Sequence, residues 1–319
     1  MKKIILAAMA FAALAACTKE TTVEINQEEI TFDKAFVDNT TKAAADPSYS
    51  SEKPLTAFKV WGTVTGQSAN PVAIFANDDV TGTVGTSSVW NCTSKTQYWI
   101  EGAKYDFVAV VNGNVATLEN GLPKTITYDA DGSKDLLYAR SNQYTGKATA
   151  NDLVKFQFAH LLSKVKFTLE NTTSAAANVG TYTYTLTNVK ITNAITEGTY
   201  TVADALTVVD SQNTYTPKGT WATTKADGQS FDSIEGVINN SSKECANEKL
   251  LVPIKNAAVS CDVNLYFGGE LISTVTKTAT VAELKAGYAY NLIVAVGLNN
   301  AIQFTVEEYT SWVNAPENI

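Results

Sequence analysis

Apolar and polar residues alternate with a period of two along most of the chain from Leu55 onward, and this alternation predicts β-strands. No window of twelve residues carries an apolar stripe with the helical period. Turn residues separate the apolar runs at intervals of about 8 to 15 residues, which is typical of β-sandwiches, and the chain is long enough for two. The clearest runs are Phe58–Val64, Pro71–Phe75, Tyr105–Val111, Val154–Phe158, Val165–Leu169, Val259–Phe267 and Ile302–Val306.

Local signals predict how some of these strands connect. Residues 98–99 and 105–111 are expected to form a hairpin across Glu101 and Gly102. At Asn188 the alternation changes phase, which indicates a bulge or a turn inside the strand that follows residue 181.

The first residues of the chain have the pattern of a bacterial lipoprotein signal. Lys2 and Lys3 precede the uncharged run Ile4–Ala16, which is too short for a membrane span of roughly 20 residues. The run ends in Leu14-Ala15-Ala16-Cys17, where small residues precede the cysteine of a lipobox. The sequence therefore predicts a signal peptide over residues 1–16 and acylation of Cys17, palmitate included, rather than a buried apolar N-terminus with a chance cysteine.

An apolar strand is predicted near each end of the mature chain. Ile30 and Phe32 form the first, and the polar, small-residue stretch Asp38–Lys53 that follows is expected to be exposed and accessible to proteases. The last strand has its apolar residues at alternate positions and is followed by two aromatic residues: Ile302, Phe304, Val306, Tyr309 and Trp312.

Charge and motif content exclude several classes of function. The formal net charge is −8 and no basic patch is present, which disfavours nucleic-acid binding. The one histidine, His160, is expected to be structural. The chain has no GxSxG, CxxC or HExxH motif and no glycine-rich phosphate loop. We therefore expect neither an enzyme nor a cofactor.

Two small groups of residues allow two interpretations each. Asp129, Asp131 and Asp135 could bind Ca²⁺ through carboxylate oxygens, but solvated turn residues are the favoured interpretation. The aromatic side chains of Trp90, Tyr98 and Trp99 are expected in the core, and they would stack on sugars if they were exposed.

With Cys17 acylated, three cysteines remain, and an odd number cannot all pair. Cys261 lies on the apolar face of a predicted strand and is expected in the core. Cys245 is expected in a polar loop, and Cys92 has no assigned partner. A Cys245–Cys261 bond remains open, because it depends on whether the two Cα atoms lie within about 7 Å.

Taken in order, these features resemble the fimbrillin family, the type V pilins of anaerobic Gram-negative bacteria. The resemblance covers nearly the whole chain and depends on the order of several weak motifs rather than on one decisive motif. After the lipobox come Ile30–Phe32 with Thr41-Lys42-Ala43, Tyr105–Val110, Lys134–Ala139, Phe156–Val165, Leu284–Leu292, Ile302–Phe304 and Trp312.

The resemblance implies an all-β fold of two tandem transthyretin-like, Greek-key β-sandwiches behind the signal peptide. The expected division is residues 17–42 for the lipidated tether and removable first strand, 43–155 for the N-terminal sandwich and 156–319 for the C-terminal sandwich. Residues 300–313 are the candidate donor strand.

The resemblance also implies a mechanism. A trypsin-like protease cleaves the lipoprotein between Lys42 and Ala43, or after the alternatives Lys34 or Lys53, and removes Ile30 and Phe32. The C-terminal strand of an identical or related pilin then fills the groove. The subunit is expected at the outer membrane and in adhesive surface fimbriae, with a host glycan or protein as receptor. Its role as stalk, tip or anchor stays open. The alternatives are a surface glycan-binding lipoprotein using Trp90 or Trp99, and a pilus-tip adhesin.

Overall fold

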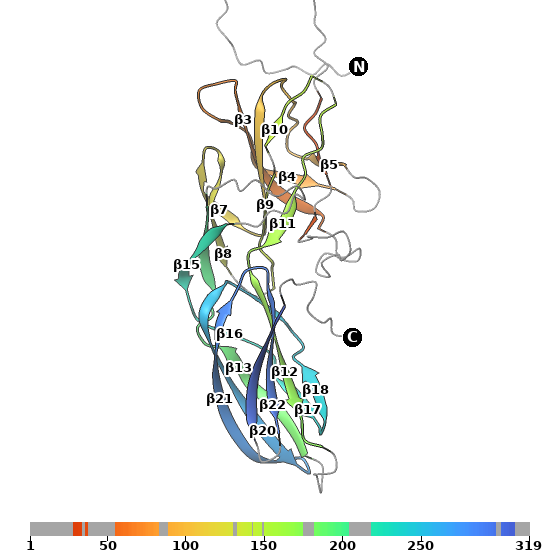
Figure 1. Cartoon of the computed structure of the whole chain (residues 1–319), viewed down its shortest axis with the longest axis vertical. Coiled ribbons are helices and arrows are strands. Elements are labelled where there is room, and N and C mark those ends of the chain that lie inside the picture. Colours follow the sequence, from red (N-terminus) through yellow and green to blue (C-terminus); the bar gives the residue numbers. More distant parts are fainter. Residues whose placement is uncertain are drawn as a thin grey trace, which may run out of the picture.

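A computed structural model gives the arrangement of the chain. It describes residues 28–33, 36–37, 55–82, 89–129, 133–141, 143–148, 150–174, 182–203, 218–297 and 301–309. The predicted all-β class is confirmed, since these residues form strands and the connections between them. Among the same residues, no helix is long and apolar enough to cross a membrane. The strands build an elongated molecule with the N-terminal sheets at one end and the C-terminal sheets at the other (Figure 1).

A nine-stranded sheet dominates the N-terminal half. Its order is β1-β5-β4-β3-β6-β9-β11-β2, and β10 pairs with β6. A bridge between Phe32 and Val154 joins β1 to the segment that leads into β11, so the sheet curls back toward its own far edge. The strands are β1 (Phe32–Asp33), β2 (Phe36–Val37), β3 (Ala57–Thr65), β4 (Val72–Thr81), β5 (Val89–Cys92), β6 (Lys104–Val111), β9 (Leu137–Arg140), β10 (Tyr144–Thr145) and β11 (Gln157–His160).

A four-stranded sheet packs against this one and combines distant parts of the chain. It has the order β15-β14-β8-β7, formed by β7 (Asn114–Glu119), β8 (Leu122–Asp129), β14 (Glu197–Val202) and β15 (Gly219–Lys225). Tyr200 pairs with Ile126, so a hairpin from the second half of the chain lies beside β8 (Figure 1). This hairpin crosses the expected boundary at residues 155–156, and the division into domains stays a prediction.

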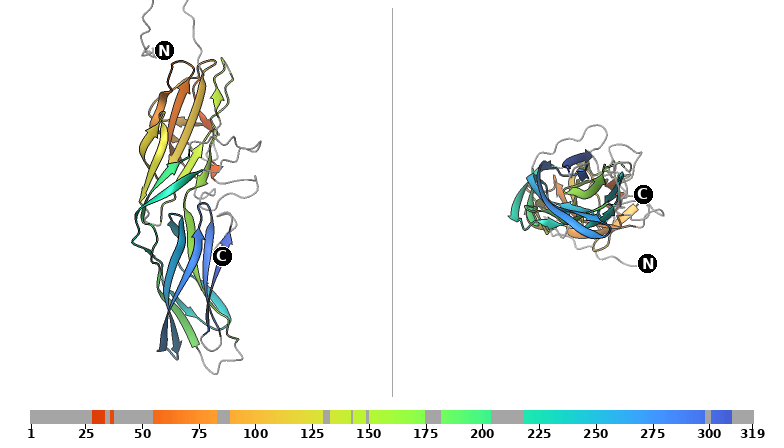
Figure 2. Two further views of the ribbon diagram at one scale, coloured as in Figure 1. Left: turned by 60° about the vertical axis from the view of Figure 1, so that its left-hand side comes forward. Right: turned by 90° about the horizontal axis from the view of Figure 1, so that it is seen from below.

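Two five-stranded sheets form the C-terminal end, and Figure 2 presents them from the side and from below. One has the order β18-β12-β22-β23 with β19 on β12, and the other has the order β16-β13-β20-β21 with β17 on β13. Their strands are β12 (Ser163–Asn171), β13 (Tyr182–Ile191), β16 (Gln229–Ser230), β17 (Ile234–Val237), β18 (Ser241–Glu244), β19 (Lys249–Leu251), β20 (Ile254–Phe267), β21 (Glu270–Leu284), β22 (Ala289–Val296) and β23 (Ile302–Tyr309).

Three apolar clusters fill the spaces between these sheets. The first lies inside the curled nine-stranded sheet and is rich in aromatic rings, including Phe32 and Trp90. The second lies between the nine-stranded and four-stranded sheets and includes Trp61 and Tyr200. The third joins the two five-stranded sheets. Trp90 and Trp99 are 1% and 3% exposed, which confirms their interpretation as core residues.

The alternation located most strands correctly but misplaced one connection. The bulge near Asn188 is confirmed, since the register of β13 shifts between Thr187 and Lys190 and Asn188 has a φ of 50°. The predicted hairpin across Glu101 and Gly102 is wrong, because β6 pairs with β3, β9 and β10 while Tyr98 bridges to Glu29. Pairing with a segment about 70 residues away leaves no mark in a local pattern.

Gly62 in the middle of β3 has a packing role. It lies opposite Phe75 on β4 and Phe107 on β6, and both rings cover it. A Cβ atom at Gly62 would lie 2.7 Å from Cδ1 of Phe107 and 3.0 Å from Cδ2 of Phe75. A side chain here would therefore displace aromatic rings of the first cluster.

We expect Gly62→Ala to lower the free energy of unfolding by about 1–3 kcal/mol, because an extra methyl overpacks a filled core. The measurement is the shift of the urea unfolding curve. Gly297→Ala is the matched control: its Cβ would meet atoms no nearer than 3.5 Å, and it should change stability by less than about 0.5 kcal/mol. Equal effects of the two substitutions would contradict this role of Gly62.

Candidate functional site

The segment Glu28–Asp33 is inserted between two other parts of the chain. On one side the N–H of Ile30 donates to the carbonyl of Gln97 at 2.8 Å, and the N–H of Trp99 donates to the carbonyl of Glu28 at 2.9 Å. On the other side the N–H of Val154 donates to Thr31, and the N–H of Asp33 donates to Val154, both at 2.9 Å. The segment is therefore a hydrogen-bonded strand with partners on both edges.

The two apolar side chains of this segment are core residues. Ile30 and Phe32 are 1% and 0% exposed. The Phe32 ring lies with its centroid 5.7–6.1 Å from four other phenylalanine rings: Phe58, Phe75, Phe107 and Phe156. Burial of each such side chain contributes roughly 1.5–3 kcal/mol to stability. Removal of the segment would thus leave an apolar groove with unpaired main-chain groups along both walls.

A partly buried polar contact fixes the start of the segment. Oε2 of Glu28 accepts hydrogen bonds from the N–H of Asn151 at 2.7 Å and from its Nδ2 at 3.0 Å. Oδ1 of Asn151 in turn accepts from the N–H of Lys147 at 2.8 Å. Sequence reasoning missed Glu28 and Asn151, because they are 123 positions apart and belong to no motif.

The C-terminal strand β23 lies at the edge of its sheet, and among the described strands it pairs with β22 alone. Ile302 and Phe304 lie opposite Val296 and Val294, and both pack half-buried against the third cluster. Val306 is 37% exposed. In contrast to Ile30 and Phe32, the alternating apolar side chains of this strand are therefore only partly covered.

Packing beneath β23 is incomplete. A cavity of about 140 Å³ lies between β23 and the edge of the facing sheet, and Ile302, Phe304, Cys261 and Ala279 are among the residues that line it. Polar contacts hold the far end of the strand: Nζ of Lys285 donates to Oε1 of Glu308 at 2.8 Å, and Nδ2 of Asn291 donates to Oε2 of Glu307 at 3.1 Å. The strand is docked mainly by main-chain pairing with β22.

Several predicted site residues lie outside the described residues. They are the lipidation residue Cys17, the processing pair Lys42 and Ala43, the alternatives Lys34 and Lys53, and the terminal Trp312. The backbone of Tyr309 ends β23 opposite Ala289, while its side chain is not described. The cleavage and lipidation sites therefore stay predictions.

The three described cysteines carry free thiols, so the Cys245–Cys261 bond is absent. Cys261 is buried as expected, and its burial raises the pKa of the thiol to about 11. Cys245 lies in the connection between β18 and β19, as expected for a loop residue, but it is buried rather than solvated, with 3% exposure. Its Sγ accepts a hydrogen bond from the N–H of Phe167 and donates one to the carbonyl of Asn247. Burial also raises the pKa of the Cys245 thiol. Both are structural core thiols.

The acidic residues considered for calcium do not form a cluster in the described part of the chain. Asp129 is exposed, Asp131 lies outside the described residues, and no group of three metal-binding side chains occurs among the described ones. Asp135 is not a solvated turn residue, which corrects the favoured interpretation. Its Oδ2 lies 2.6 Å from Nδ1 of His160, and both residues are buried, so His160 belongs to a structural pair.

Comparison with known proteins agrees with this architecture. A family model described as fimbrillin-like matches residues 41–308. A fimbrial protein from Bacteroides vulgatus has a similar solved structure, with a TM-score of 0.59, 15% identity and coverage of 88% of this chain and 98% of that chain. The solved structure of a candidate cell adhesion protein from Parabacteroides distasonis is also similar, with a TM-score of 0.50, 9% identity and coverage of 92% of this chain and 98% of that chain. At such identities the two structures support the fold alone.

No curated protein matches the chain. The family model spans residues 41–308 of 319 and so covers well over half of the sequence. The chain therefore belongs to the fimbrillin-like family.

Proposed function

We propose that this protein is a structural pilin subunit of adhesive cell-surface fimbriae, assembled by exchange of a β-strand. The observation that carries the proposal is the inserted segment Glu28–Asp33, which completes a core through Ile30 and Phe32 and immediately precedes the predicted processing region. Strand addition gains main-chain hydrogen bonds along a sheet edge, while alternate side chains fill pockets.

The C-terminal strand has the properties that a donor needs. Ile302, Phe304 and Val306 repeat the i, i+2 spacing of Ile30 and Phe32. β23 is an edge strand whose apolar side chains are partly exposed, so less buried surface is lost when it leaves its own sheet than when a core strand leaves. Transfer to the groove of another subunit would bury these side chains more completely.

The remaining steps follow from the sequence and the family. The precursor is exported as a lipoprotein through Cys17 and reaches the outer membrane, and a trypsin-like protease cleaves after Lys42. The two sandwiches are transthyretin-like. The partners are identical or related pilins. The glycan-binding alternative through Trp90 or Trp99 loses its surface, because both indoles are buried.

Brief trypsin treatment of the folded protein should cleave after Lys42 and produce an SDS-resistant ladder on an unboiled gel. The reason is that loss of the first strand exposes an apolar groove that only another strand can fill. Lys42→Gln should abolish both the cleavage and the ladder. A ladder of equal intensity from Lys42→Gln would show that processing occurs elsewhere, and cleaved wild-type protein that stays monomeric would contradict strand exchange by this subunit.

Phe304→Ser should reduce the ladder by at least about tenfold, because the loss of a buried aromatic side chain in the groove exceeds the 1.4 kcal/mol that corresponds to one decade. Gln303→Ser, one position along on the exposed face of β23, is the matched control and should leave the ladder unchanged. Thermal unfolding checks that both monomers are folded. Equal ladders from the two folded variants would contradict a donor role for the apolar face of β23.

A further inference from the structure

Polar side chains occupy inward-facing positions at one end of the space between the nine-stranded and four-stranded sheets. In that space Trp61, Val108, Tyr138 and Ile126 belong to the second apolar cluster. Side chains two positions apart in a strand share a face. The residues two positions before or after these four, toward the same end of the sheets, therefore face the same space. They are Thr63, Asp106, Arg140 and Lys124.

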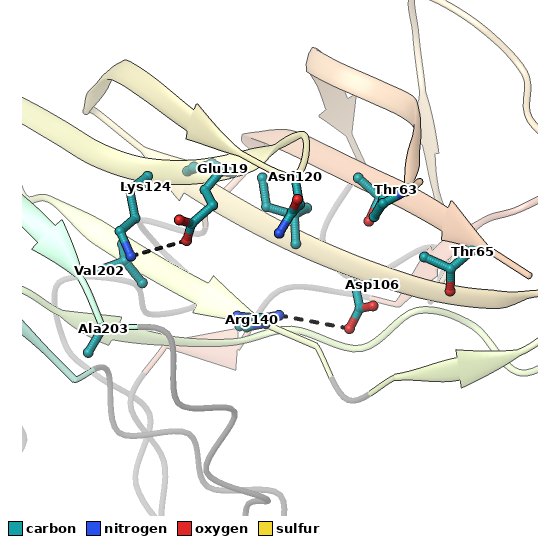
Figure 3. A pocket seen from close by; sticks show the side chains of 12 residues that line it. Thr63, Thr65, Asp106, Glu119, Asn120, Lys124, Arg140, Val202 and Ala203 are labelled. Carbon is teal, nitrogen blue, oxygen red and sulfur yellow. Dashed lines mark hydrogen bonds and ion pairs between the residues drawn. The ribbon is translucent and has the colours of Figure 1, made fainter. Parts of the chain in front are cut away.

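The strand register brings these positions together. Thr63 on β3 lies opposite Asp106 on β6, and Val108 on β6 lies opposite Arg140 on β9. Lys124 enters from β8 in the facing sheet (Figure 3). These inward-facing positions, on three strands of one sheet and one strand of the other, thus line a polar pocket. The alternating pattern of the strands would predict apolar core residues there.

Two of the buried polar atoms have no hydrogen-bond partner in the described part of the protein. They are Nε of Arg140 and Oδ1 of Asp106, and the two side chains are only 17% and 14% exposed. Nη2 of Arg140 lies 3.9 Å from Oδ1 of Asp106, which is too long for a hydrogen bond. Oδ2 of Asp106 accepts from Nε2 of Gln143 at 3.1 Å.

Arg140 and Asp106 form a long ion pair without a hydrogen bond between them. A buried arginine and a carboxylate normally meet through two parallel hydrogen bonds, which compensate for the loss of water. Here the guanidinium and the carboxylate point toward each other, as the dashed line in Figure 3 marks, but their 3.9 Å separation is too long for a hydrogen bond. A buried polar group that lacks a protein partner needs an explanation, and water or a small ligand held in the pocket is one.

The pocket has the size and chemistry for a small polar ligand. Its volume is about 220 Å³, which is below the roughly 300–1,000 Å³ of pockets for drug-sized molecules. Lys124 and Arg140 contribute two positive charges, and Asp106 and Glu119 contribute two negative charges. Nζ of Lys124 lies 3.1 Å from Oε2 of Glu119 at the more exposed side. The balanced charge disfavours a phosphate or a carboxylate as the ligand.

Hydrogen-bonding capacity further restricts the ligand class. Arg140 offers only donors, Asp106 only acceptors, and Asn120 and Thr63 offer both. A hydroxyl group is both donor and acceptor, so a ring carrying several hydroxyls can satisfy such a lining at neighbouring positions. Pro71, Pro123 and Val202 add apolar surface for the C–H face of a ring. We propose that this pocket binds one neutral sugar ring, as a free monosaccharide or as the terminal residue of a glycan.

The test is saturation-transfer NMR of the purified full chain with five neutral sugars (glucose, galactose, mannose, fucose and N-acetylglucosamine) and with glucuronate as an anionic comparison. Each is used at up to about 50 mM, above the millimolar range of weak binding. Methyl glycosides of the same sugars distinguish a glycan terminus, which still binds with its anomeric carbon blocked, from a free sugar. We expect at least one sugar to bind, and Arg140→Gln and Asp106→Asn each to weaken binding by about tenfold or more, since each removes a hydrogen bond to a charged group.

Lys147→Gln is the matched control, because Lys147 is exposed and lies outside the pocket. This variant should bind sugar like the wild-type protein. Thermal unfolding of each variant, with and without sugar, separates loss of binding from loss of folding. Folded Asp106→Asn or Arg140→Gln with wild-type affinity would overturn the proposal. Absence of signal from every sugar, or preferential binding of glucuronate, would also overturn it. The pocket contains neither Ile30, Phe32 nor any part of β23, so these results are independent of strand exchange.

Discussion

The insertion of Phe32 into an aromatic core is the interaction on which the N-terminal half of this structure depends. The curled nine-stranded sheet is completed by a short strand from the beginning of the chain, with hydrogen bonds on both of its edges. Without that strand, the N–H groups of Trp99 and Val154 and the rings around Phe32 would face water. A fold built in this way needs a strand at that place, but the strand need not come from the same chain.

The two ends of the chain differ in how firmly their strands are held. Ile30 and Phe32 are fully buried, and Glu28 is anchored through Asn151. β23 lies at a sheet edge above a cavity, with Val306 more than one third exposed. This difference is what the proposed strand exchange requires, because the first strand is held by its core while the candidate donor strand has little packing to lose. Trp90 and Trp99 are also core residues, so neither indole is available at the surface for a receptor.

The alternation of apolar and polar residues was sufficient to predict the all-β class, most strands and the bulge near Asn188. Pairing between distant segments could not be predicted, because a period of two fixes the face of a residue but not its neighbour strand. The bridge between Glu29 and Tyr98 and the hairpin of β14 and β15 beside β8 are examples.

The polar pocket illustrates the same limit. The alternation of Tyr138, Ala139 and Arg140 already puts Arg140 on the face of a core tyrosine, which is a signal that local reasoning can detect. Its meaning appears only when the register brings Asp106, Thr63 and Lys124 to the same end of the sheets. The burial of Cys245 and Asp135 was not predicted for a related reason: their neighbours in the sequence are polar, and the residues that cover them come from distant parts of the chain.

The most direct test of the account is the structure of the processed polymer by electron cryo-microscopy, at a resolution that identifies side chains. We expect the strand between Gln97–Trp99 and Val154 to be residues 302–309 of a neighbouring subunit, with Phe304 or another apolar residue of that strand in the place of Phe32. Density for Glu28–Asp33 of the same chain at that position, or β23 still paired with its own β22, would contradict strand exchange as the basis of assembly.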